Sequence, residues 1–71
     1  MNKAIGKSLK ALRKNKGLSQ EAVAEYLNIS QSAYSRIETG DSNSWSIHLE
    51  RLCNFYKVEP ATIFKIITNI R

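Results

Sequence analysis

A short row of amide, hydroxyl and guanidinium groups lies near the middle of the sequence. We call it the recognition row, and it consists of Gln31, Ser32, Ser35 and Arg36. An amide can pair bidentately with adenine, a serine hydroxyl can donate to or accept from several bases, and an arginine can reach guanine O6 and N7 or a phosphate. None of the four side chains is acidic, so none repels phosphates. The row can therefore hydrogen-bond to the edges of base pairs in double-stranded DNA.

Two short helices joined by a tight turn would position this row. Ser19 and Ser30 are good N-cap residues. The helices predicted after them span about residues 20–27 and 31–39. Asn28 tolerates the left-handed backbone that a tight turn needs, and Gly40 suits the position after a helix end. The pattern over about residues 19–39 predicts a helix-turn-helix, whose second helix enters the major groove with its N-terminus first.

The remaining sequence predicts three further helices, so the expected fold is all-α with about five short helices in one domain, residues 1–71. Apolar residues recur at a spacing of three or four, and glycine and proline are sparse. The first helix should span about residues 3–15, the fourth should begin near Trp45, and Pro60 should open a fifth over about 60–69. We expect Trp45 to be a packing anchor and Tyr34 to be half-buried.

Composition excludes several classes of protein. The 71 residues include 11 Lys and Arg against 6 Asp and Glu, a net charge of +5, and 42% are hydrophobic, which is too many for a disordered tail. One cysteine and one histidine exclude a disulfide scaffold and a zinc finger. No apolar run approaches the length of a membrane span, and no catalytic triad or phosphate-binding loop is present. We expect a cytoplasmic, non-enzymatic protein without metal, cofactor, small-molecule ligand or membrane contact.

The stretch from Leu18 to Gly40, LSQEAVAEYLNISQSAYSRIETG, resembles the helix-turn-helix of the phage repressor and Cro (Cro/C1-type) class, the XRE family. The resemblance extends over about residues 5–64 and implies a lambda-repressor-like DNA-binding domain. It places Gln31, Ser32 and Ser35 at base-facing positions, Gln20 at a phosphate, and Arg13 and Glu38 in a structural salt bridge.

These features predict a sequence-specific transcriptional regulator that binds double-stranded DNA as a dimeric repressor at a pseudo-palindromic operator. Asn43 and Ser44 should join Gln20 in contacting phosphates. Arg36 could contact DNA or form a salt bridge with Glu25. An alternative function is that of an antitoxin, or of another protein-interaction module with the same fold.

An isoleucine stripe marks the predicted C-terminal helix: Ile63, Ile66, Ile67 and Ile70. Some of these residues should close the core of the monomer. Four isoleucines nevertheless exceed what one small domain easily covers, and large exposed apolar patches usually mark interfaces. We therefore predict a homodimer that is formed through this stripe.

A lysine row follows one side of the first predicted helix: Lys3, Lys7, Lys10 and Lys14. Any one of these lysines could simply be solvated. Residues 1–16 hold six cations and no acid, which favours nonspecific attraction to nucleic acid. A helix on a membrane surface is a competing interpretation, but the apolar side of this helix has no aromatic residue.

Overall fold

The computed structural model describes residues 2–63. It contains the helices α1 (Asn2–Asn15), α2 (Gln20–Leu27), α3 (Gln31–Thr39) and α4 (Trp45–Tyr56). Residues 60–63 are also helical, so a fifth helical segment begins at Pro60, as predicted. Residues 2–63 contain no strand, and the all-α prediction is confirmed. Of the isoleucine stripe, Ile66, Ile67 and Ile70 lie outside the described residues.

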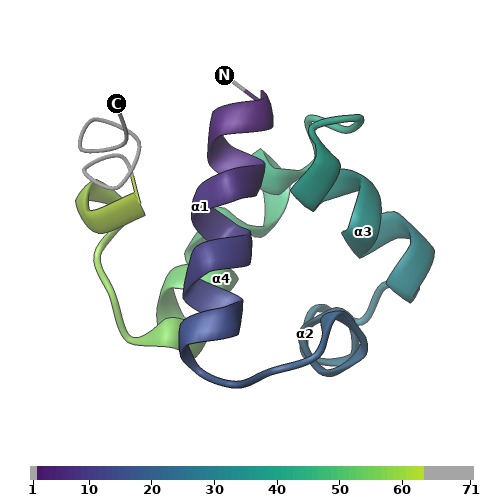
Figure 1. Ribbon diagram of the computed structural model, residues 1–71. Coiled ribbons are helices and arrows are strands. Elements are labelled where there is room, and N and C mark those ends of the chain that lie inside the picture. The colour runs from purple at the N-terminus through teal and green to yellow at the C-terminus, as the bar shows by residue number, and fades with distance from the viewer. Residues whose placement is uncertain (1, 64–71) are drawn as a thin grey trace.

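Helix α1 is the central element of the fold (Figure 1). Helix α3 packs beside α1 and against α2, and α4 lies behind α1 in this view. Apolar side chains from all four helices form one core, which includes Leu9 of α1, Leu27 of α2, Ile37 of α3 and Leu52 of α4. The core therefore holds the two helices of the predicted helix-turn-helix against α1 and α4.

Both helices of the motif begin and end at the residues that the sequence indicates. Oγ of Ser19 accepts a hydrogen bond from the backbone N–H of Ala22 at 3.0 Å, and Oγ of Ser30 accepts one from Ala33 at 3.0 Å. Asn28 ends α2 in the left-handed conformation with φ 61°, and its backbone N–H bonds to carbonyls of the last turn. The turn between α2 and α3 is therefore specified by local chemistry.

A close approach between α1 and α3 depends on Gly6. A Cβ atom on Gly6 would lie 2.7 Å from the carbonyl oxygen of Ile37 and closer still to that of Glu38. Only a residue without a side chain fits there, because backbone atoms cannot move aside as a flexible side chain can. The glycine at position 6 therefore allows α3 to pack this close to α1.

Two predictions on apolar residues need correction. Tyr34 is completely buried in the core and not half-buried, because it faces away from the exposed side of α3. Ile63 is also completely buried, and its backbone carbonyl accepts a hydrogen bond of 3.4 Å from the buried hydroxyl of Ser8. Ile63 therefore closes the core of the single chain and is not available as an interface residue.

Candidate nucleic-acid interface

The recognition row lies on the outer side of α3. Gln31, Ser32 and Arg36 are exposed, and Ser35 is partly exposed. The opposite side of α3 is buried in the core through Tyr34 and Ile37. The row therefore projects from a helix whose other side is fixed, which is the arrangement that reading base edges requires.

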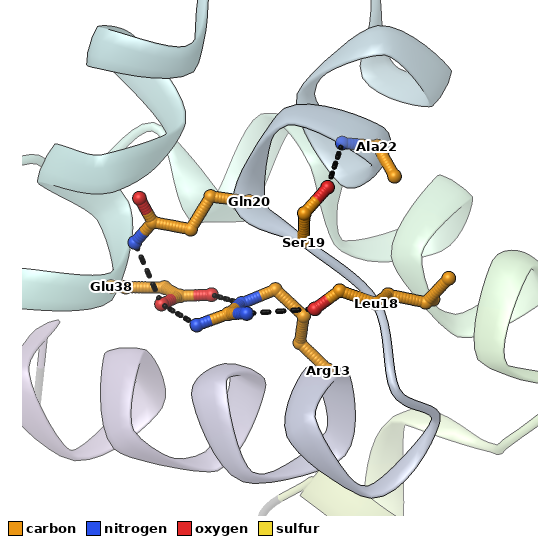
Figure 2. A network of polar contacts seen from close by, with 6 residues as sticks. All are labelled: Arg13, Leu18, Ser19, Gln20, Ala22 and Glu38. Atoms are coloured by element: carbon orange, nitrogen blue, oxygen red, sulfur yellow. Dashed lines mark hydrogen bonds and ion pairs between the residues drawn. The ribbon is translucent and has the colours of Figure 1, made fainter.

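An ion pair holds the last turn of α3 to α1 (Figure 2). Nε of Arg13 lies 2.7 Å from Oε2 of Glu38, and Nη2 donates to Oε1 at 3.2 Å. The side chains are only 10% and 2% exposed, respectively. Nη1 of Arg13 also donates to the backbone carbonyl of Leu18 at 2.8 Å. This bidentate geometry is among the strongest that charged side chains form, and it sets the orientation of α3.

Gln20 joins the same network from the start of α2. Its Nε2 donates to Oε1 of Glu38 at 3.0 Å, and its side chain is partly buried (Figure 2). The sequence indicated a phosphate contact for Gln20 but not this link. Glu38 therefore connects α1, α2 and α3 through a single carboxylate.

The surroundings of Glu38 favour its charged form. Burial alone would raise the pKa of Glu38, but the hydrogen bonds from Arg13 and Gln20, with Tyr34 close by, outweigh burial and hold the pKa below its ordinary value. Burial raises the pKa of Tyr34 well above its ordinary value and that of Tyr56 to about 12. Both hydroxyls are buried, and neither has a hydrogen-bond partner within residues 2–63. Two neutral phenols thus lie beneath the ionic network.

The loop between α3 and α4 carries the other two predicted phosphate contacts. Asn43 is exposed, and its backbone carbonyl accepts from the backbone N–H of Ser46 at 3.3 Å. Ser44 is partly buried, and its Oγ lies 2.8 Å from Oγ of Ser42. Among residues 2–63 the exposed side chain of Asn43 forms no hydrogen bond, whereas the hydroxyl of Ser44 is already hydrogen-bonded to that of Ser42.

The family model of the helix-turn-helix, HTH_3, matches residues 9–63. The chain belongs to the helix-turn-helix family. Its fold is similar to the crystal structure of the clp gene regulator ClgR from C. glutamicum, with a TM-score of 0.85 and 24% sequence identity over 94% of this chain and 87% of that chain. A comparison with curated proteins found no match. Helix-turn-helix domains bind DNA through their second helix, which here is α3.

A contact that local sequence patterns do not indicate ties this helix-turn-helix to α4. Arg51 donates to the backbone carbonyls of Leu27 and Tyr26, at 3.1 and 2.6 Å, and its guanidinium carbon lies 5.4 Å from the centre of the Tyr26 ring. These carbonyls belong to the last turn of α2, where a cation is favourable. Arg51 and its two partners are 24 and 25 residues apart in the chain, so only the tertiary fold brings them together.

Arg36 is exposed, and within residues 2–63 the ion pair found is that of Arg13 and Glu38, so the predicted alternative of Arg36 with Glu25 is not formed. Trp45 packs against the core, and its Nε1 donates to the side chain of Asn2 at 2.8 Å. No described helix has the length and apolar character to cross a membrane. Over the same residues, no three His, Cys, Asp or Glu side chains gather as metal ligands would.

Proposed function

We propose that this helix-turn-helix protein is a sequence-specific transcriptional regulator that binds double-stranded DNA as a homodimer and represses by occupying an operator. The observation that carries the proposal is the exposed recognition row on a helix that is held by a buried ion pair. A rigid helix with outward amide, hydroxyl and guanidinium groups can discriminate bases, because its donors and acceptors are already positioned before DNA arrives.

The contacts divide into two kinds. Gln31, Ser32 and Ser35 would meet base edges, with Arg36 at a guanine or a phosphate. Gln20 and Asn43 would position the duplex through its backbone, and Ser44 would do so after releasing Ser42. The side-chain amide of Gln20 can keep its bond to Glu38 and still donate to a phosphate, because it carries two N–H groups.

Two-fold symmetry would set the form of the operator. A homodimer presents two copies of α3, and if these lie about 34 Å apart they enter successive major grooves on one side of the duplex. The expected operator is then a pseudo-palindrome with half-sites about 10 base pairs apart.

Selection of bound sequences from a random duplex pool, repeated at two salt concentrations, tests the proposal. We expect an inverted repeat to be enriched, and the affinity for it to fall steeply with salt because lysines and arginines displace counterions from phosphates. Salt-sensitive binding without an enriched motif would contradict sequence-specific regulation.

The variant Gln31→Ala tests the recognition row itself. We expect it to lose about 1–3 kcal/mol of binding free energy at one base pair and to relax the preference there, as measured by competition between operators with single substitutions. Asn54→Ala, at an exposed position of α4, is the control. A base preference for Gln31→Ala identical to that of the wild type would remove Gln31 from the interface.

A further inference from the structure

The lysine row is a strongly basic surface that the recognition row does not explain. Lys3, Lys7, Lys10 and Lys14 are all exposed. Residues 1–20 contain no acid, and the carboxylate of Glu38, which packs against α1, is already paired with Arg13. Within residues 2–63 no ion pair includes a lysine of this row. Asp41 follows Gly40 near Lys3, but it forms an ion pair with none of these described lysines, so the charge on this side of α1 is largely uncompensated.

The lysine row faces a different direction from the recognition row. Helix α1 meets α3 at Gly6 and Arg13, and at its N-terminal end Lys3 lies beside Gly40, the residue that ends α3. At about 100° per residue, the centre of the lysine row lies about a quarter turn around α1 from that contact. Helix α3 meets α1 through Ile37 and Glu38, and the exposed residues Ser32 and Arg36 lie about half a turn around α3 from that contact. The two rows therefore point in directions that differ by about a quarter turn, so a straight duplex that lies against α3 does not run along the whole lysine row.

We propose that the lysine row binds a second segment of double-stranded DNA, independently of its sequence. Lys3 and Lys14 lie about 16 Å apart along the axis of α1, and a duplex presents one negative charge for about every 1.7 Å of its length. Four flexible ammonium groups match such a regular polyanion. The row includes no amide or aromatic group to read a base, so its contacts are to phosphates.

The side of α1 opposite the lysine row argues against a lipid surface as the ligand. A helix that lies on a membrane inserts its apolar side among the lipids. The apolar side of α1, with Ile5, Leu9 and Leu12, is buried in the core. A duplex needs only the cationic side, which is the side that α1 exposes.

Two double variants of equal charge test the proposal. Lys7→Gln/Lys14→Gln removes two lysines of the row, and Lys16→Gln/Lys57→Gln removes two exposed lysines outside it, so each changes the net charge from +5 to +3 (5 − 2). Affinity for a random-sequence duplex is measured over a range of salt, and circular dichroism checks that both variants are folded.

We expect the first variant to reduce the slope of log K against log salt by about 2 and to lower the affinity about tenfold at low salt. The second should change the slope by less than half as much. Equal changes in the two variants would show that only net charge matters and would overturn the proposal. Tighter binding of the wild type to phosphatidylserine vesicles than to the duplex would also overturn it.

A capture experiment tests whether the second segment can be a separate duplex. One duplex is immobilised and loaded with protein, and a labelled second duplex is added. We expect the wild type and the Lys16→Gln/Lys57→Gln variant to capture it, and Lys7→Gln/Lys14→Gln to lose most of the capture. Capture that persists in the last variant, or that is absent in the wild type, would overturn a second duplex on the lysine row.

This inference does not depend on the proposed operator function, because its probe is a random duplex. If Gln31→Ala leaves base preference unchanged while Lys7→Gln/Lys14→Gln weakens random-duplex binding, the operator function is wrong and the lysine row stands. The reverse pair of results would retain the operator function and reject the lysine row.

Discussion

Glu38 is the carboxylate on which the placement of the recognition helix depends. Its replacement by glutamine leaves the guanidinium of Arg13 buried without its counter-charge, at a cost of about 3 kcal/mol in the free energy of unfolding. Urea denaturation at pH 7 measures this loss. Glu50→Gln, on the exposed side of α4, is the control, and it should change stability by less than about 0.5 kcal/mol. A loss of similar size in both variants would mean that the buried pair contributes nothing specific.

The carboxylate of Glu38 also makes the free energy of unfolding depend on pH, and stability is lost in acid. The pKa of Glu38 in the folded protein lies below its ordinary value, so its contribution is complete above about pH 5 and is lost as the pH falls through the folded pKa. We expect the wild type to lose stability below about pH 5 more steeply than Glu38→Gln, in urea titrations at a series of pH values. Parallel curves would assign the acid sensitivity to other carboxylates.

Tyr56 carries a buried hydroxyl for which the described part of the chain, residues 2–63, provides no hydrogen-bond partner. Tyr56→Phe removes this group at little cost in packing, so it should be neutral or stabilise the protein by up to about 1 kcal/mol at pH 7. The pKa of Tyr56 is raised to about 12, so its neutral form contributes stability that is complete below about pH 10 and is lost as the pH rises toward 12. Thermal unfolding should show a flatter alkaline decline for Tyr56→Phe than for the wild type. A clear loss of stability at pH 7 would reveal a hydrogen bond to the hydroxyl.

At the scale of elements, the contact between α1 and α3 predicts that Gly6→Ala destabilises the protein, although helix propensity alone predicts that it stabilises. In an open helix, Gly→Ala stabilises by about 1 kcal/mol. At Gly6 the added Cβ would meet the carbonyl oxygens of Ile37 and Glu38, so we expect Gly6→Ala to destabilise by about 1–3 kcal/mol. Chemical denaturation measures it, with Lys10→Ala on the exposed side of α1 as the control. A stabilised Gly6→Ala would mean that α1 and α3 can separate without cost.

The helices themselves were largely predictable because their signals are local. Ser19, Ser30 and Asn28 act within four residues of their own positions, and each does what its residue type indicates. The link between Gln20 and Glu38 and the bonds from Arg51 to α2 were not predicted. They join residues 18 to 25 positions apart, and such contacts are decided by how the helices pack and not by spacing.

The recognition row was predictable for a related reason, since a helix exposes the side opposite its apolar residues. Tyr34 shows where this reasoning is incomplete. The expectation was a half-buried side chain, but both the ring and the hydroxyl of Tyr34 are completely buried. Burying the aromatic ring gains more free energy than burying one hydroxyl costs. Helical periodicity alone does not predict which of these two energies is larger.

At the scale of the whole molecule, the chain buries a core of its own, and Ile63 already belongs to it. The predicted dimer interface therefore consists of Ile66, Ile67 and Ile70. We expect sedimentation to show a wild-type dimer at micromolar concentration and a folded monomer for Ile66→Asn/Ile67→Asn, because polar side chains at an interface disfavour its burial.

The variant Ile63→Val distinguishes the loss of the dimer from a general loss of core packing. Removing one methylene from a buried site should cost about 0.5–1.5 kcal/mol of stability and leave the dimer intact. The monomeric variant should melt at a temperature that does not depend on its concentration, whereas dimerisation should raise the melting temperature of the wild type as its concentration rises. The variant should also lose most of its affinity for a two-half-site operator, since recognition helices on separate monomers are no longer linked. If Ile66→Asn/Ile67→Asn instead loses stability without a change in mass, those isoleucines complete the core of the monomer, and the predicted interface is wrong.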